Sequence, residues 1–204
     1  GDIEAEFYEE KLDLNNIDKI KEADIISIFI NSEINKEIID KLPNLKFIAT
    51  RSTGYDHIDI EYAKTKEIKI SNVPSYGAHT VAEYTFALIL SLSRKVFLSY
   101  QNLRDGIGFD ISSFRGFDLF GKTLGVVGTG KIGKNVIKIA KGFNMNVLAN
   151  DLFPDLEFAL SNDFKYVSLE EILNSSDVIT LHIPYTKENH HLINKDNIKK
   201  IKKG

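Results

Sequence analysis

Apolar runs of strand length alternate with segments of helical period along most of this chain. In the first part, strands are predicted at residues 3–10, 23–30, 45–52 and 68–74, and helices at 34–43 and 58–67. The run at 23–30 is almost continuously apolar, and the run at 45–52 is interpreted as the next strand along the chain. This alternation predicts an α/β fold in which helices cover both faces of the sheet.

A second alternating block begins after residue 120. Strands are predicted at 123–128, 145–151, 165–168 and 177–183, and helices at 131–143, at 169–176 and near 195–203. Ser168 and Glu171 form a capping-box pattern that supports a helix start, and Gly204 stands where a C-cap glycine belongs. This block therefore predicts a second parallel sheet.

The two blocks are separated by a segment of a different kind. One long helix is predicted at 79–104, and because it is apolar on most sides we expect it to be buried between layers or domains. Residues 106–120 are rich in Gly and Phe and predict an extended arm. We therefore expect three parts, at 1–78, 79–120 and 121–204.

A glycine pattern opens the second block. Gly128, Gly130 and Gly133 form G-x-G-x-x-G between a predicted strand and a predicted helix, and the next strand ends at Asp151. The three glycines suit a tight turn, close approach of a pyrophosphate and close packing of the helix, whose N-terminus attracts phosphate. A carboxylate at 151 can accept hydrogen bonds from the adenine ribose and would repel a 2′-phosphate, so the pattern favours NAD over NADP. A glycine-rich turn without a ligand and an FAD site are the alternatives.

Composition narrows the function classes. The net charge of −3 provides no field that would attract nucleic acid or an anionic membrane. The sequence has no Cys, which excludes disulfides, thiolate metal sites and a cysteine nucleophile, and which fits the cytoplasm. Its longest apolar run, "FALILSLS", is far shorter than the roughly 20 residues of a membrane span.

Several charged or metal-ligating residue types are interpreted as structural. His190 and His191 are adjacent, so in a strand or loop we expect their rings to point in opposite directions, and no metal site is predicted. Glu83 and Arg94 are expected to be surface or ion-pair residues. The basic segment 194–204 is expected to be a solvated helix face.

Four motifs in order carry a family resemblance: "RSTGYDHIDIEYAK", "NVPSYGAHTVAEYTFAL", "LGVVGTGKIG" and "SDVITLHIPYTKENHHLIN". Together they cover nearly the whole chain, and they resemble the D-isomer-specific 2-hydroxyacid dehydrogenases. "NVPSYG" is most similar to the D-lactate dehydrogenase branch of that family. The resemblance implies hydride transfer between NADH and a small 2-oxo acid, pyruvate in that branch. It also implies an incomplete flavodoxin-like substrate domain followed by the first half of a Rossmann domain.

The resemblance assigns roles to residues of this chain. Backbone N–H groups around Thr53 and Gly54 would bind the substrate carboxylate, and Tyr76 would close over the substrate. On the cofactor side it implies contacts from Val81, Lys131, Ile132, His182, Pro184 and Thr186. A simple turn at 52–54, a packed surface aromatic at 76 and a structural histidine at 182 remain open as alternatives.

The family's catalytic Arg, Glu and His are expected beyond Gly204, and its first substrate-domain strand and helix before the segment 3–10. The resemblance therefore implies a chain truncated at both ends and inactive by itself. It also implies a homodimer, formed through the helix at 79–104 and the arm at 106–120. A non-catalytic NAD-sensing relative and a fragment without function are the competing interpretations.

Overall fold

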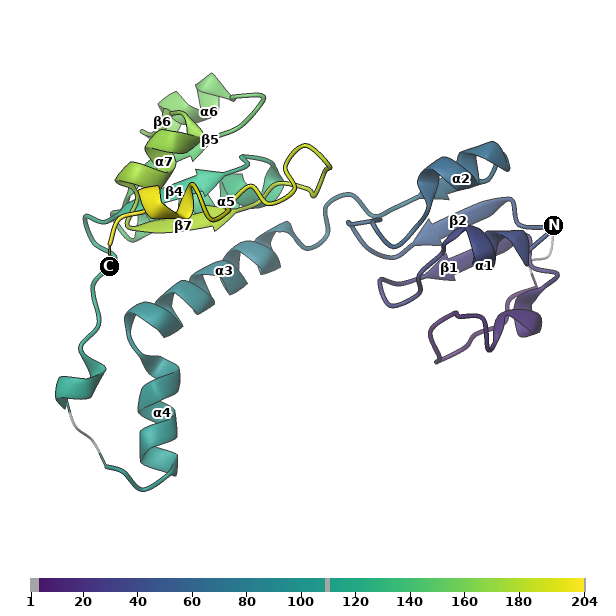
Figure 1. The fold of residues 1–204 in the computed structure, drawn as a ribbon, viewed down its shortest axis with the longest axis horizontal. Coiled ribbons are helices and arrows are strands. Elements are labelled where there is room, and N and C mark those ends of the chain that lie inside the picture. The colour runs from purple at the N-terminus through teal and green to yellow at the C-terminus, as the bar shows by residue number, and fades with distance from the viewer. Residues whose placement is uncertain (1–3, 109–110, 204) are drawn as a thin grey trace. The chain divides into compact units, whose positions relative to one another are not determined.

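The computed structural model describes residues 4–108 and 111–203, which divide into two compact units (Figure 1). The first unit comprises residues 1–76 and the second comprises residues 77–204. Each unit contains one parallel β-sheet with helices packed on it, so the predicted α/β class with two parallel sheets is confirmed. No helix within the described ranges is long and apolar enough to cross a membrane.

The first unit has a three-stranded sheet with the order β1-β2-β3. Its strands are β1 (Ile25–Ile28), β2 (Phe47–Thr50) and β3 (Lys69–Ser71), and its helices are η1 (Ile17–Ile20), α1 (Lys36–Asp40) and α2 (Ile60–Thr65). Ile26, Ile48 and Ile70 lie side by side across the three strands. Isoleucines from these strands and from α1 form the core of the unit, because β-branched side chains pack well on a pleated surface.

The two α-helices of the first unit, α1 and α2, each begin at a side-chain cap. Asn35 accepts a hydrogen bond from the backbone N–H of Ile38 at 3.1 Å, and Asp59 accepts one from that of Tyr62 at 3.0 Å. These caps satisfy N–H groups that would otherwise lack a partner in the first helical turn. The loops that precede α1 and α2 are thereby attached to the helices that follow them. Because the three strands are parallel, their carboxyl ends lie at one edge of the sheet.

The strand predicted at 3–10 is wrong for the described residues 4–10, which form no regular structure and are exposed. Phe7, on the expected inward face, is 93% exposed. An apolar side chain that stays in water contributes nothing to offset the entropy of ordering a strand. The alternating pattern at 4–10 therefore did not produce a strand, and the sheet of the first unit consists of β1, β2 and β3.

The second unit has a four-stranded parallel sheet with the order β6-β5-β4-β7. The strands are β4 (Thr123–Val127), β5 (Asn146–Asn150), β6 (Lys165–Tyr166) and β7 (Val178–Leu181). In chain order this is 3-2-1-4, the arrangement found in the first part of a Rossmann sheet. The order changes direction at β4, so the crevice beyond the end of this strand is where a ligand is expected.

Helices cover both faces of this sheet. They are α3 (Ala78–Ser93), α5 (Lys131–Gly142), α6 (Leu156–Ser161) and α7 (Leu169–Ser175). The predicted cap of α7 is confirmed, because the Ser168 hydroxyl accepts a hydrogen bond from the backbone N–H of Glu171 at 3.1 Å. Helix α6, which Asp155 caps, was not predicted from the sequence. The main core lies between the sheet and the helices α3 and α5.

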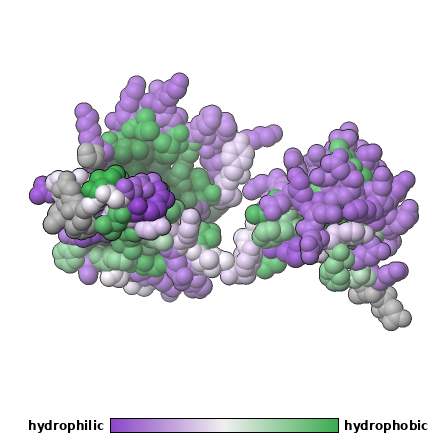
Figure 2. Space-filling view, turned by 90° about the horizontal axis from the view of Figure 1, so that it is seen from below, coloured by the Kyte–Doolittle hydropathy of each residue, from purple (hydrophilic) through white to green (hydrophobic). Residues whose placement is uncertain are grey.

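The single helix predicted at 79–104 is wrong. Two helices, α3 and α4 (Val96–Arg104), are separated at Lys95, whose φ of 55° is left-handed and interrupts the helical hydrogen bonds. Helix α3 buries only Ala82, Phe86, Ile89 and Ser93, and α4 buries no residue, so the expected burial on most sides is also wrong. Figure 2 shows hydrophobic residues at the surface of this unit. The exposed large apolar or aromatic residues of α3 and α4 include Tyr84, Leu88, Leu92, Phe97, Tyr100 and Leu103.

The final helix predicted near 195–203 is also wrong. Only the 3-10 helix η3 (Ile198–Lys200) forms there, and Gly204 lies outside the described residues. The lysines are not simply solvated, because Lys200 pairs with Glu170 at 2.7 Å and Lys202 pairs with Asp177 at 3.2 Å. These ion pairs attach an extended segment to the surface of the second unit where a free helix was expected.

Candidate functional site

The turn from β4 into α5 is built around its three glycines. Gly128 has a φ of +93°, and a Cβ there would lie 2.6 Å from the carbonyl oxygen of His182. A Cβ at Gly133 would lie 2.0 Å from the carbonyl oxygen of Gly128, so this glycine allows the helix to contact the turn. A Cβ at Gly130 would have no neighbour within 4 Å. The first and third glycines are therefore required by the fold, whereas the second keeps open space beside the backbone.

The N-terminus of α5 faces this open space. The helix begins at Lys131 after Gly130, and its first turn is closed by the bond from the N–H of Lys134 to the carbonyl of Gly130 at 2.9 Å. Lys131 and Ile132 have no carbonyl four residues earlier in the helix, so their N–H groups are available to an external acceptor. The positive end of the helix dipole adds to the attraction for an anion. This corner therefore fits the phosphates of a dinucleotide.

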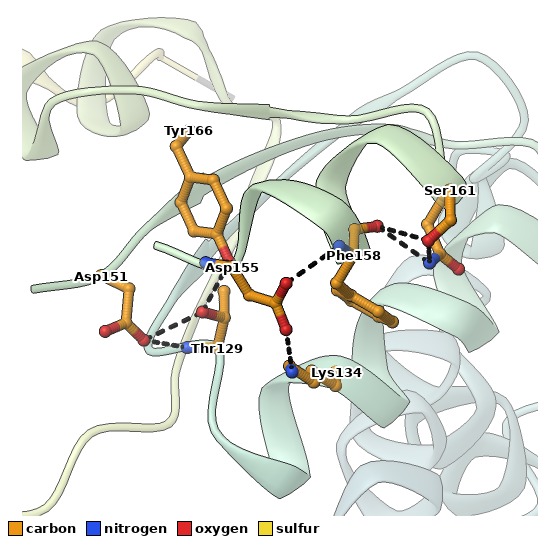
Figure 3. Close-up of polar contacts among 8 residues, drawn as sticks. Thr129, Lys134, Asp151, Asp155, Phe158, Ser161 and Tyr166 are labelled. Atoms are coloured by element: carbon orange, nitrogen blue, oxygen red, sulfur yellow. Dashed lines mark hydrogen bonds and ion pairs between the residues drawn. The ribbon is translucent and has the colours of Figure 1, made fainter. Parts of the chain in front are cut away.

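Asp151 points toward the glycine turn (Figure 3). Its Oδ2 atom accepts hydrogen bonds from the backbone N–H of Thr129 at 2.5 Å and from the Thr129 hydroxyl at 3.0 Å, while Oδ1 accepts one from the N–H of Phe153 at 2.9 Å. An ionised carboxylate has about four acceptor positions, so Oδ1 keeps capacity for a ribose hydroxyl. The distance between the carboxylate and the turn is thereby fixed before any ligand binds.

These contacts keep Asp151 ionised. Burial acts to raise the pKa of this carboxyl, but the backbone N–H groups of Phe153 and Thr129 and the Thr129 hydroxyl outweigh it and lower the pKa below its usual range. A fixed negative charge at this position repels a second negative group, because like charges in a partly desolvated site interact strongly. The site therefore disfavours a ribose that carries a 2′-phosphate.

A polar network supports Thr129 from the opposite side (Figure 3). The hydroxyl of Tyr166 lies 2.9 Å from the Thr129 hydroxyl and accepts a hydrogen bond from the N–H of Asp155 at 3.1 Å. Asp155 also caps α6 and pairs with Lys134 of α5. Strand β6 and helices α5 and α6 are thus connected through side chains that end at the glycine turn.

The segment after β7 forms the other side of the corner. The N–H of His182 donates to the carbonyl of Val127 at 2.7 Å, which holds this segment against the end of β4. The Nε2 atom of His182 is buried and has no hydrogen-bond partner among the described residues, and burial lowers the pKa of this ring. Pro184 and Thr186 are exposed. The side-chain amide of Asn189 holds their loop, because it donates a hydrogen bond to the carbonyl of Pro184 and accepts one from the N–H of Thr186.

Val81 lies in the first turn of α3 and is 43% exposed. Of the other residues on this helix, Arg94 forms the kind of ion pair that was expected, with Asp118 at 2.6 Å, and Glu83 is exposed.

The adjacent histidines do not point in opposite directions as expected. His191 has a φ of 55°, and the ring centroids of His190 and His191 lie 3.7 Å apart. The left-handed residue removes the alternation of a strand, so the two rings lie against each other with an interplanar angle of 32°. Within the described ranges no group of three or more His, Cys, Asp or Glu side chains could hold a metal ion.

The first unit has a corner of its own, where β2 ends. Thr53 and Gly54 are exposed there, and next to them lies a hollow of about 470 Å³. The hollow is lined by Phe29, Arg51, Val73 and Tyr76, which follow the carboxyl ends of the three strands. The guanidinium of Arg51 has no carboxylate within ion-pair distance among the residues that the structure describes. This hollow is therefore apolar with one free cation at its edge.

Sequence reasoning missed several residues of these sites. Thr129 was not predicted as a site residue, because it stands at a variable position of the glycine pattern. Its hydroxyl lies between two glycines of a turn that was expected to face Asp151, and this could have indicated a hydrogen bond between the two residues. Arg51 directly precedes the "STG" corner and could have been selected as a cation. Tyr166 and Asn189 gave no sequence signal, because only the folded chain brings them to their partners.

The sequence is similar to known proteins along nearly its full length. Residues 86–204 match the family described as "D-isomer specific 2-hydroxyacid dehydrogenase, NAD binding domain". The chain is 37% identical over 201 residues to a 2-hydroxyacid dehydrogenase homolog of Zymomonas mobilis, covering 97% of this chain and 60% of that protein. It is 36% identical over 204 residues to the D-lactate dehydrogenase of Escherichia coli, covering 99% of this chain and 61% of the relative.

A solved structure agrees in fold and sequence. The D-lactate dehydrogenase of Aquifex aeolicus, complexed with NAD and lactic acid, is similar with a TM-score of 0.84 and 39% identity over 92% of this chain and 56% of that one. The chain thus spans about three fifths of the length of the curated relatives it matches. The glycine corner, the Rossmann strand order and the match over 86–204 all indicate an NAD-binding domain. NAD is the cofactor of the matched domain. The chain belongs to the D-isomer-specific 2-hydroxyacid dehydrogenases, and its residues 86–204 match their NAD-binding domain.

Proposed function

We propose that this chain is the cofactor-binding and part of the substrate-binding portion of an NAD-dependent oxidoreductase that interconverts pyruvate and D-lactate. In the reaction, hydride passes from NADH to the carbonyl carbon of the 2-oxo acid and a proton adds to the oxygen. The observation that carries this proposal is the corner between β4 and α5, with open space at Gly130 and the carboxylate of Asp151 facing the turn. The D-lactate dehydrogenases of E. coli and A. aeolicus among its relatives support the choice of substrate.

NAD would be held at three places of the second unit. The pyrophosphate would lie beside Gly128 and Gly130 and accept hydrogen bonds from the N–H groups of Lys131 and Ile132, with Gly133 keeping the helix close. Asp151 would bind the adenine ribose. The remaining proposed contacts to the cofactor are Val81, His182, Pro184 and Thr186. The open space at Gly130 and the buried Nε2 atom of His182, which has no partner among the described residues, support these assignments.

The substrate would be bound by the first unit. The N–H groups of Thr53 and Gly54 would hold its carboxylate, and Tyr76 would cover it from the rim of the apolar hollow. In this proposal the parts 1–78, 79–120 and 121–204 serve as partial substrate domain, connecting helix and arm, and first half of the NAD-binding domain. The free guanidinium of Arg51 beside the hollow supports an anionic substrate.

The cofactor proposal is tested by replacing Gly130 with Ala. A Cβ at this position meets no protein atom, so the fold should be unaffected, but it would occupy the space of the pyrophosphate. Calorimetry with NADH should show at least about a tenfold loss of affinity, because the pyrophosphate would be displaced from the backbone N–H groups of the turn. A tenfold loss corresponds to about 1.4 kcal/mol of binding free energy. The matched control is Gly142→Ala at the other end of α5, where the new Cβ also meets nothing. Equal affinity of both variants would refute the assignment of the corner.

The reaction is tested separately. With pyruvate and NADH at high protein concentration, we expect negligible NADH oxidation by these 204 residues, because the Arg, Glu and His of the family have no counterpart within them. Robust turnover would show that an acid and a cation in this chain perform the chemistry. NADH binding without turnover is the expected combination.

The exposed apolar side chains of α3 and α4 support a homodimer. Leu92 is 74% exposed and Phe97 is 64% exposed, and exposed large apolar side chains in such number are typical of an interaction surface. Sedimentation of the chain and of the Leu92→Lys variant tests this, and we expect the variant to shift toward monomer. An unmodified chain that sediments as a monomer at high micromolar concentration would contradict the dimer.

A further inference from the structure

The corner after β2 contains three successive peptide groups whose carbonyls are all tied to the first unit. The carbonyl of Ser52 accepts a hydrogen bond from the N–H of Val73 at 3.0 Å. The carbonyl of Thr53 accepts one from the side-chain amide of Asn72 at 2.8 Å, and the carbonyl of Gly54 accepts one from the Ser52 hydroxyl at 2.6 Å. The orientation of each peptide plane is therefore fixed by a bond on its carbonyl side.

The N–H sides of the same peptide groups are free. The N–H groups of Thr53, Gly54 and Tyr55 donate to no acceptor within residues 4–108 and 111–203, and all three residues are exposed. A peptide whose carbonyl accepts a hydrogen bond is polarised, and this makes its N–H a stronger donor. Successive free N–H groups of this kind form a concave site for an anion.

The bond to Gly54 is the end of a longer chain of hydroxyl groups. The hydroxyl oxygens of Thr50 and Ser52 lie 2.6 Å apart, and the Thr50 hydroxyl lies 3.1 Å from Nε2 of His57. Thr50 and Ser52 are 2% and 3% exposed, so water does not compete for these bonds. A neutral ring is expected at pH 7, because burial lowers the pKa of His57 against a weaker opposing effect of Asp56.

Only one direction of donation is consistent with this chain. A carbonyl oxygen can only accept, so the single proton of the Ser52 hydroxyl is used on Gly54. Ser52 must then accept the proton of the Thr50 hydroxyl, and Thr50 must accept from His57. The imidazole therefore carries its proton on Nε2 and donates into the chain.

We propose that His57, Thr50 and Ser52, together with Asn72, are positioning residues that hold the N–H groups of Thr53, Gly54 and Tyr55 as a three-amide cradle for the carboxylate of the substrate. This inference rests on the proposed function and deepens it: the cradle is the carboxylate subsite, and its third donor is the N–H of Tyr55. None of the positioning side chains touches the substrate. Their effect on binding is transmitted through the peptide planes.

The first test uses the unmodified chain and needs no ligand. Long-range ¹H–¹⁵N NMR spectra at pH 7.5 report which ring nitrogen of His57 is protonated. We expect the Nε2–H tautomer, with the Nε2 proton protected from exchange. The Nδ1–H tautomer would reverse the direction of donation and overturn the positioning chain.

The second test compares two substitutions of one residue. Thr50→Val removes the hydroxyl and keeps the shape, whereas Thr50→Ser keeps the hydroxyl. Titration with sodium pyruvate, followed through the amide shifts of residues 53–55, should give a Kd that is about fivefold to tenfold higher for Thr50→Val, since one buried hydrogen bond is lost. Thr50→Ser should restore most of the affinity. The control Thr65→Val removes an exposed hydroxyl that bonds the carbonyl of Tyr62 at 2.7 Å, and it should bind pyruvate like the unmodified chain.

The outcomes separate the two proposals. If pyruvate shifts the amides of 53–55 equally in the unmodified chain and in Thr50→Val, the positioning role is refuted while the substrate site stands. If pyruvate leaves these amides unchanged in the unmodified chain, both the cradle and the proposed substrate site are refuted, while NAD binding is unaffected. A fivefold loss that Thr50→Ser recovers would support the inference, because a general loss of stability would not be rescued by the shared hydroxyl alone.

Discussion

Replacing Gly133 with Ala tests how tightly α5 is packed on the glycine turn. The new Cβ would lie 2.0 Å from the carbonyl oxygen of Gly128 and 3.0 Å from its carbonyl carbon. Both atoms belong to the backbone, so the clash can be relieved only if the helix moves away from β4. Such overpacking costs about 1–3 kcal/mol or more, and the higher helix propensity of Ala returns about 0.5–1 kcal/mol. We expect a net loss of about 2 kcal/mol, which lowers the Tm of the second unit by about 4–8 °C.

The control for this prediction lies in the same helix. Gly142→Ala introduces a Cβ that meets no atom within 4 Å, so only the gain of about 0.5–1 kcal/mol remains and the Tm should rise by about 1–4 °C. Differential scanning calorimetry of both variants measures the two shifts, and calorimetry with NADH should show weaker binding only for Gly133→Ala. Equal positive shifts would show that the helix has room at Gly133, and this would refute the packing argument.

Three further predictions follow from the same corner. Asp151→Asn should weaken NADH binding and reduce the preference for NADH over NADPH by about tenfold, because the repulsion of the 2′-phosphate is removed, and competition calorimetry measures this ratio. The pKa of Asp151 is lowered in the folded chain, so its carboxylate stabilises the fold above the unfolded pKa, and this stabilisation is lost as the pH falls. Urea midpoints measured between pH 5 and pH 3 should therefore decline less steeply for Asp151→Asn than for the unmodified chain. Burial lowers the pKa of His182, so its NMR titration midpoint should lie below the ordinary value of about 6.5, and a midpoint above this value would show that the ring is paired or exposed.

The sequence predicted the sheets better than their surroundings. The runs at 23–30 and 45–52 became the strands β1 and β2, in which every second residue is buried, because apolar side chains at alternate positions of a strand face the core. The glycine spacing and Ser168 also predicted real corners, since φ angles and caps are local properties. Lys95 shows the limit of such reasoning: nothing in an apolar helical pattern indicates that one lysine adopts a left-handed conformation and divides the helix.

The candidate site was less predictable for the same reason. Asp151 could be found by counting from the glycines, but its partner Thr129 is fixed by Tyr166, which lies 37 positions away in the sequence. The hydroxyl chain from His57 to Ser52 also depends on a loop that folds back onto the end of β2. Contacts of this kind depend on tertiary packing, and one sequence contains no periodicity that would indicate them.

Among the residues that the structure describes, the two hydrophobic clusters have no member in common: the buried members of one lie within residues 17–68 and those of the other within residues 82–164. Heat capacity traces should therefore resolve two cooperative blocks, and NADH should raise the melting of only the later one. A substitution at a buried position of one cluster then removes apolar contacts from that cluster alone.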